Sequence, residues 1–197
     1  MSFMLQCIFA QDIMESRKGE IMKFTLKDGS LATLRRIRAK DYEEVMAYLN
    51  KFSCGKGAKW TNEYPGAKRN KEAFVRRFES DNELFLGVWN DKGLIGQGCI
   101  FLNGLNHPWN VLRADFGLSV LEEYTSCGVG TKILKELEKW AVKKKVHRIH
   151  AKVRHNNKRG LGLYLKMGYQ IEGMAKETAF FDNQWQHEYD LAKIVNS

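Results

Sequence analysis

The feature that most constrains the fold is a change of hydrophobic period between residues 112 and 141. From Leu112 to Val120 apolar and polar residues alternate, which is the period of a strand with one buried face. Beyond residue 128 the apolar residues recur at helical spacing and form one stripe: Val129, Ile133, Leu134, Leu137, Trp140 and Ala141. The turn "TSCGVG" joins the two segments and carries Gly128 and Gly130. The sequence therefore predicts a strand, a tight glycine turn and a helix in direct succession.

Turn signals and periodicity divide the rest of the chain into short elements. Turn-forming residues between β-rich runs predict three hairpins, turning at Asp28-Gly29, at residues 91–93 and at Asp182-Asn183. The remaining segments are predicted as helices over 40–52 (capped by Asp41), 71–78 and 158–167 (stopped by Gly168), and as a strand over 147–155. Because helices separate some strands but not others, this order predicts one mixed sheet with helices on both faces.

Charge and composition restrict the class of protein. A chain of 197 residues is long enough for one domain with its own core. Its 32 Lys and Arg outnumber 23 Asp and Glu, and the net charge of +9 attracts anions such as nucleic acid, anionic lipid or a polyphosphate cofactor. The four cysteines form no CxxC, so we expect reduced thiols in a cytoplasmic protein. The five histidines show no metal-ligand spacing and no apolar run is long enough to span a membrane, so we expect neither a metal nor a membrane.

The glycine turn has the makings of an anion site. The first amides of a helix have no partner within the helix, and the helix dipole adds partial positive charge there. Glycine lets the backbone approach a phosphate without an intervening Cβ. The stretch matches neither the Walker loop nor the dinucleotide fingerprint, and a tight turn without a ligand remains the alternative.

Two motifs give the turn a more specific meaning. "TSCGVG" resembles the (Gln/Arg)-x-x-Gly-x-(Gly/Ala) cofactor motif of the GNAT superfamily of N-acetyltransferases, with Thr125 in place of the usual Gln or Arg. "NKRGLGLYLKMGY" resembles that family's second signature, with Asn157 and Tyr164 in register and Gly160 where alanine is usual. Both motifs occur in the family's order, with a helix and a strand between them.

The resemblance implies a fold and a domain organisation. The expected fold is a single α/β (α+β) domain, with a mixed, mostly antiparallel twisted sheet flanked by helices. A V-shaped opening is expected between the family's fourth and fifth strands. We expect residues 21–197 to form this domain and residues 1–20 to be an N-terminal extension.

The resemblance also implies a binding mode for acetyl-CoA as cosubstrate. The pyrophosphate would lie on the amides of Ser126, Cys127, Gly128, Val129, Gly130 and Thr131. The pantetheine arm would pair like a strand with Leu118, Ser119 and Val120. Asn157 would hydrogen-bond that arm, and Tyr164 would lie near the sulfur.

Two residues are the predicted catalytic groups. The family transfers acetyl directly to an amine, which requires removal of a proton from the amine and protonation of the departing thiolate. Tyr164 is the expected acid and Asp115, on the polar side of its strand, the expected base. The alternatives are aromatic packing for Tyr164 and a solvated carboxylate, paired with Arg113, for Asp115. Without an acyl-enzyme, Cys127 has no catalytic role.

The resemblance thus implies an acetyl-CoA-dependent N-acetyltransferase whose acceptor is a primary amine, in a small molecule or at a peptide or protein N-terminus. The acceptor side would include aromatic residues that could equally be core or homodimer contacts: Trp60, Tyr64, Phe180, Phe181 and Trp185. The alternative from another class is a non-catalytic, basic nucleic-acid- or ribosome-binding module, although the sequence has no RRM, KH or helix-turn-helix signature.

Overall fold

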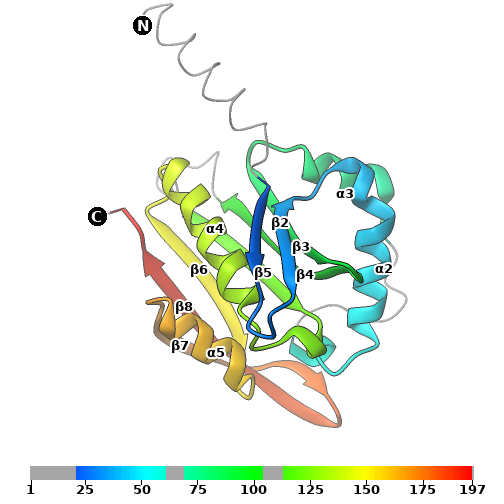
Figure 1. Cartoon of the computed structure of the whole chain (residues 1–197). Coiled ribbons are helices and arrows are strands. Elements are labelled where there is room, and N and C mark those ends of the chain that lie inside the picture. The colour runs from blue at the N-terminus through cyan, green and yellow to red at the C-terminus, as the bar shows by residue number, and fades with distance from the viewer. Residues whose placement is uncertain (1–20, 61–68, 104–112, 197) are drawn as a thin grey trace, which may run out of the picture.

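The computed structural model describes residues 21–60, 69–103 and 113–196, and the predicted N-terminal extension, residue 197 and Tyr64 lie outside these ranges. The described chain forms one eight-stranded sheet in the order β1-β2-β3-β4-β5-β6-β8-β7 (Figure 1). Every neighbouring pair is antiparallel except β5 and β6, which confirms the predicted mixed, mostly antiparallel sheet. The strands are β1 (Met22–Thr25), β2 (Leu31–Arg36), β3 (Glu83–Asn90), β4 (Gly93–Asn103), β5 (Arg113–Val120), β6 (Arg148–Arg154), β7 (Gln170–Phe181) and β8 (Gln184–Ile194).

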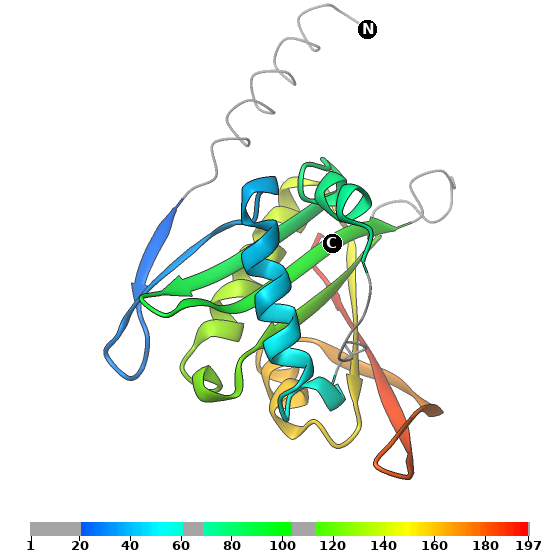
Figure 2. The same ribbon diagram turned by 90° about the vertical axis from the view of Figure 1, so that its right-hand side faces the viewer.

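Helices cover both faces of this sheet, as the order of elements predicts. Two of them, α2 and α3, stand on one face, and α4 lies on the other (Figure 2). No helix within the described ranges is long and apolar enough to cross a membrane. The helices are α2 (Tyr42–Ser53), α3 (Lys71–Phe78), α4 (Val129–Lys143) and α5 (Lys158–Lys166), with single 3₁₀ turns η1 (Ala39–Asp41), η2 (Ala58–Trp60) and η3 (Glu122–Tyr124).

The helix α4 packs directly on the backbone of β4. The apolar stripe of α4 is buried except for Trp140, which is half-buried. A Cβ at Gly96 would lie 2.7 Å from Val129 Cγ1, and one at Gly98 would lie 2.6 Å from Ile133 Cγ2. These two glycines therefore set how closely the helix approaches the sheet, and they fix its N-terminus beside the end of β5.

The predicted hairpins are present, but one turn differs from its prediction. The turn at Asp182-Asn183 joins β7 and β8 with positive φ at both residues, 52° and 56°, as a two-residue turn of type I′ requires. The Asp28-Gly29 hairpin instead closes through a five-residue loop, residues 26–30. There Asp28 Oδ1 accepts hydrogen bonds from both the amide and the hydroxyl of Ser30, which favours a longer loop held by the aspartate side chain.

Asp41 does not cap α2, contrary to the sequence prediction. Its carboxylate accepts hydrogen bonds from the Arg35 guanidinium at 2.7 and 3.0 Å and from the Arg38 amide at 2.9 Å. The Arg35 guanidinium and the Arg38 amide hold the pKa of Asp41 below its usual value, although burial opposes them. The Asp41 side chain therefore binds Arg35 of β2, and it does not cap α2 as the local sequence predicts.

β5 and β6 separate soon after they meet. They pair only from Arg113 to Asp115, opposite residues 148–150, although β5 continues to Val120 and β6 to Arg154. Each strand stays paired on its outer side, β5 with β4 and β6 with β8. The separation is the V-shaped opening of the predicted fold. It lies between this chain's fifth and sixth strands, because the strand before the glycine turn, which is the fourth in the family pattern, is the fifth strand here.

The close approach of α4 to β4 gives a stability prediction. Gly98→Ala should lower the free energy of unfolding by about 1–3 kcal/mol, because its methyl group meets Ile133 and Leu137 in a packed core. Gly162→Ala is the matched control, since a Cβ at this exposed α5 position meets nothing within 4 Å and should stabilise by about 0.5–1 kcal/mol. Urea unfolding measures both. Equal stability of the two variants would contradict the packing described for α4.

Candidate functional site

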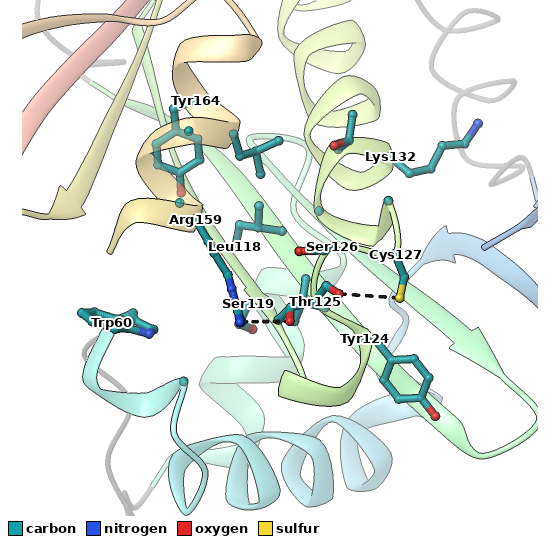
Figure 3. Close-up of a pocket in the computed structure, with 18 of the residues that line it drawn as sticks. Trp60, Leu118, Ser119, Tyr124, Thr125, Ser126, Cys127, Lys132, Arg159 and Tyr164 are labelled. Atoms are coloured by element: carbon teal, nitrogen blue, oxygen red, sulfur yellow. Dashed lines mark hydrogen bonds between the residues drawn. The ribbon is translucent and has the colours of Figure 1, made fainter. Parts of the chain in front are cut away.

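A pocket of about 710 Å³ occupies the opening between β5 and β6 (Figure 3). Its walls come from four parts of the chain that are distant in sequence. They are the first hairpin, the segment from α2 to Trp60, the strand-turn-helix segment 118–135, and the segment from β6 into α5. The pocket therefore exists because the two strands separate, and it could not be read from any one segment.

One end of the pocket is the glycine turn. Ser126 and Gly128 both have positive φ, 64° and 95°, and Gly128 is the residue before α4. No side chain caps this helix, and Gly128, Gly130 and Thr131 line the pocket. Unpartnered amides at the N-terminus of a 15-residue helix form an anion site. A left-handed serine is uncommon, and Ser126 marks a loop shaped at some conformational cost.

Contacts outside the helix hold this loop in place. The Lys27 amide donates to the Cys127 carbonyl at 3.3 Å, which fastens the loop to the first hairpin. The Cys127 thiol lies 3.6 Å from the Thr125 carbonyl, and the Thr125 hydroxyl donates to the Glu122 carbonyl at 2.8 Å. Cys127 thus has a place in the loop that needs no reactive thiol.

The lining of the pocket is predominantly basic. Among the described residues, six basic side chains line the pocket against one carboxylate, Glu122. The basic residues are Lys27, Lys132, Lys135, Lys152, Arg159 and Lys166. A wall with this excess of cations attracts a polyanionic ligand more strongly than the net charge of the chain alone would.

Arg159 is a pocket residue that the sequence analysis missed. Its guanidinium reaches from α5 to the glycine turn, where Nη1 donates to Thr125 Oγ1 at 2.9 Å and to Glu122 Oε1 at 2.8 Å (Figure 3). Thr125 stands at the motif position where Gln or Arg is usual. The structure therefore brings a cation to this position from another helix, 34 residues further along the chain.

The separated edge of β5 forms a second wall. Leu118, Ser119 and Val120 line the pocket, and their strand is paired with β4 on the far side. The edge that faces the opening is therefore free of a β6 partner and can pair with an extended ligand. The Ser119 hydroxyl accepts a hydrogen bond from Tyr48 of α2 at 3.1 Å, which ties this wall to the opposite layer.

Asn157 lines the pocket as the N-cap of α5. Its Oδ1 accepts a hydrogen bond from the Gly160 amide at 2.9 Å, so its amide group is the part left to donate to a ligand. A Cβ at Gly160 would lie 2.8 Å from Asn157 Nδ2 and 3.1 Å from Val153 Cγ2. The glycine that departs from the family pattern therefore leaves room for the capping side chain as it is placed here.

Tyr164 points from α5 into the pocket (Figure 3). Its side chain is 8% exposed and packs edge-on against Phe116 of β5, with ring centroids 5.2 Å apart. It also packs against Tyr169, at 5.8 Å. Burial raises the pKa of Tyr164 to about 12, so its hydroxyl stays protonated at any physiological pH.

The predicted site residues divide into those the pocket brings together and those it does not. Val129 faces β4 and does not line the pocket, although it belongs to the first turn of α4. Asp115 lies beside the pocket without lining it. The predicted residues that line it are Leu118, Ser119, Val120, Ser126, Cys127, Gly128, Gly130, Thr131, Asn157 and Tyr164.

Asp115 has partners that the sequence does not suggest. Its Oδ1 lies 2.7 Å from His150 Nδ1 on β6, and its Oδ2 accepts a hydrogen bond from the Asn103 amide on β4. Among the described residues no group of His, Cys, Asp and Glu could hold a metal ion. Spacing could not have found this pair, because Asp115 and His150 are 35 residues apart and meet only through the sheet register.

The aromatic residues predicted for the acceptor side also divide. Trp60 lines the pocket opposite the glycine turn. Phe180, Phe181 and Trp185 are exposed near the turn of the β7–β8 hairpin, where Phe180 and Trp185 contact each other at 5.1 Å. Those three lie outside the pocket lining.

Comparisons with known proteins agree with this geometry. A sequence model of the acetyltransferase (GNAT) family matches residues 55–169. The spermidine N(1)-acetyltransferase of Thermoplasma acidophilum is 28% identical over 153 residues, which is 78% of this chain and 89% of that protein. A GNAT-family acetyltransferase from Streptococcus pneumoniae superposes with a TM-score of 0.74 at 23% identity, covering 83% of this chain and 99% of that one. The yncA protein of Salmonella typhimurium, whose structure contains its cofactor acetyl-CoA, superposes with a TM-score of 0.70 at 13% identity, covering 84% and 94%.

The anion site at the start of α4 gives the second prediction. Gly130→Asp should lower affinity for coenzyme A by at least tenfold, because it places a carboxylate among the amides that would hold the pyrophosphate. Gly130→Ala is the control, since it adds only the Cβ, 3.2 Å from Leu163 Cδ2. Calorimetric titration measures both. Equal affinities in the two folded variants would contradict the assignment of this turn to phosphate.

Proposed function

Because this chain belongs to the acetyltransferase (GNAT) family, we propose that it transfers the acetyl group of acetyl-CoA to a primary amine by direct attack. The observation that carries the proposal is the pocket in the β5–β6 opening. One end of the pocket offers uncapped helix amides and cations for a polyphosphate, and its wall offers a free strand edge for an extended arm. Similarity to a spermidine acetyltransferase supports an amine acceptor.

The two ends of the pocket support one direction for the bound cosubstrate. With its phosphates at residues 126–131, just after β5 ends, an extended arm along residues 118–120 runs back toward the point where β5 and β6 meet. Phe116 and Tyr164 lie at that end and contact each other. The transferred group would therefore lie beside the Tyr164 hydroxyl.

Tyr164 would act on the departing sulfur as a hydrogen-bond donor. A thiol titrates near ~8.5 and the pKa of Tyr164 is raised to about 12, so full proton transfer to the thiolate would be uphill by about 5 kcal/mol. A hydrogen bond that strengthens as the C–S bond breaks stabilises the developing charge without that transfer.

A panel of amines tests the proposed function. Purified protein with acetyl-CoA should release free thiol when given the right acceptor from a set of polyamines, amino acids, aminoglycosides and N-terminal peptides. A thermal shift with coenzyme A and with RNA, at low and moderate salt, should show stabilisation by the coenzyme. Stabilisation by RNA alone, with no thiol release, would favour the nucleic-acid-binding alternative.

Arg159 gives the third prediction. Arg159→Gln should weaken binding of acetyl-CoA about threefold to tenfold, with a smaller effect at high salt, because it removes an exposed cation beside the phosphate site. Lys144→Gln is the control, since Lys144 lies at the far end of α4 and does not line the pocket. Unchanged affinity in Arg159→Gln would show that this guanidinium serves only Glu122 and Thr125.

Tyr164 gives the fourth prediction. Tyr164→Phe keeps the ring against Phe116 and should lower kcat about 10²-fold, with little change in affinity for acetyl-CoA. Because the raised pKa keeps the hydroxyl protonated, wild-type activity should not fall between pH 7 and 10 through Tyr164. Steady-state kinetics over this range test both points. An alkaline fall near pH 9 that disappears in Tyr164→Phe would contradict the second.

A further inference from the structure

A row of polar side chains crosses the sheet where β5 and β6 part. Asp115 and His150 are the last paired residues of these strands. Asp115 Oδ1 lies 2.7 Å from His150 Nδ1, and His150 Nε2 lies 3.5 Å from Asp190 Oδ1 on β8. The side chains of all three are between 22 and 33% exposed, which leaves them accessible to a small group from solvent.

The hydrogen bonds in this row assign the protons. A carboxylate can only accept, so the 2.7 Å contact requires His150 Nδ1 to carry a proton. In neutral His150 the other nitrogen, Nε2, is then an acceptor, and it faces a second acceptor, the carboxylate of Asp190. His150 Nε2 and Asp190 Oδ1 lie 3.5 Å apart, so an ammonium group placed beside them could donate a hydrogen bond to each.

Asp115 is less suited to be the base than its sequence position suggests. One of its oxygens is taken by His150 and the other accepts a hydrogen bond from Asn103. Both carboxylate oxygens of Asp115 are therefore already engaged within the protein. The same bonds hold the imidazole in one orientation, with Nε2 free of a backbone or amide partner in the described contacts.

We propose that His150 is the residue that takes the proton from the acceptor amine, with Asp115 positioning its ring and Asp190 binding the ammonium group. This inference rests on the proposed acetyl transfer and names the acceptor subsite within it. The ligand class is a primary ammonium, whose three N–H donors can reach both Nε2 and the Asp190 carboxylate.

The row connects to the pocket through Lys152. This residue lines the pocket, and its Nζ lies 3.7 Å from Asp190 Oδ1. Phe116, the next residue after Asp115, contacts Tyr164 on the other face of the sheet. The acceptor amine at His150 and the acetyl group at Tyr164 would thus approach the same point from opposite faces of the sheet, through the gap between β5 and β6.

The proposed transfer begins with deprotonation of the bound ammonium group. His150 Nε2 takes one proton from R–NH₃⁺, and this frees the nitrogen lone pair. The neutral amine attacks the thioester carbonyl carbon, so a C–N bond forms, and the C–S bond breaks as the tetrahedral intermediate collapses. The thiolate that leaves takes a second proton from the new amide nitrogen, and His150 returns its proton to solvent.

Other charges around His150 are paired with one another. Arg148 of β6 forms an ion pair with Glu172 of β7, and Lys152 lies near Asp190. Glu172 is close enough to His150 for their charges to interact, and the two carboxylates nearest the ring are Asp115 and Asp190. Among the described residues, the carboxylate next to His150 Nε2 is that of Asp190, and this is where an ammonium group could reach both groups.

Kinetics of His150→Gln test the proposal. The variant should lose about 10²-fold in kcat at neutral pH, the lower end of what a general base contributes. The variant should also require amine that is already deprotonated in solution. Its log kcat/KM should therefore rise with pH at unit slope until the pH reaches the pKa of the amine. Imidazole added to His150→Ala should restore part of the rate. His147→Gln, which alters an exposed histidine outside this row, is the control and should behave as wild type.

The other members of the row give distinct results. Asp190→Asn should raise KM for the amine at least tenfold with little change in kcat, and Asp115→Asn should lower kcat less than His150→Gln does. Unchanged affinity for coenzyme A, by calorimetry, would show that each variant is folded. A wild-type pH profile and kcat in His150→Gln would overturn this proposal alone, whereas no transfer by the wild type to any amine would overturn the proposed function.

Discussion

The site depends on one constraint, the loss of pairing between two parallel strands after three residues. β5 and β6 part after Asp115 and His150, while β5 stays paired with β4 along its whole length and β6 stays paired with β8. The crossover helix α4 makes them parallel, and its close packing on Gly96 and Gly98 fixes the start of the helix at the end of β5. This arrangement produces three features: a free edge on β5, an uncapped N-terminus on α4 and a gap in the sheet between β5 and β6.

The two faces of the sheet contribute different chemistry to that gap. Cations and helix amides gather at the α4 end, where a polyphosphate would be bound. The opposite face carries the row Asp115, His150 and Asp190, and Lys152 Nζ lies 3.7 Å from Asp190 Oδ1. The basic side chains that line the pocket suit a polyanionic ligand.

Two departures from the family motifs are resolved by neighbours in space. Thr125 replaces the Gln or Arg usual at its position, and Arg159 of α5 brings a guanidinium to its hydroxyl. Gly160 lacks the usual methyl group, and the Asn157 side chain fills the space where that methyl would lie. Comparison with the motif one position at a time finds the usual side chain missing at Thr125 and at Gly160. In the folded chain another residue occupies each place, Arg159 at the first and Asn157 at the second.

The sequence by itself determined the elements and the glycine turn that lines the pocket. Period-two alternation over β5, the helical stripe of α4 and the Asp182-Asn183 turn were each predicted correctly, because local geometry fixes side-chain spacing and the sign of φ. The family resemblance that the two motifs carry predicted ten residues that line one pocket, although their roles toward acetyl-CoA stay predictions. The tertiary structure alone decided the partners: Asp41 with Arg35 in place of a helix cap, Arg159 with Thr125, and His150 with Asp115. Such pairs are set by sheet register and helix docking, which bring together residues whose separation along the chain carries no periodic signal.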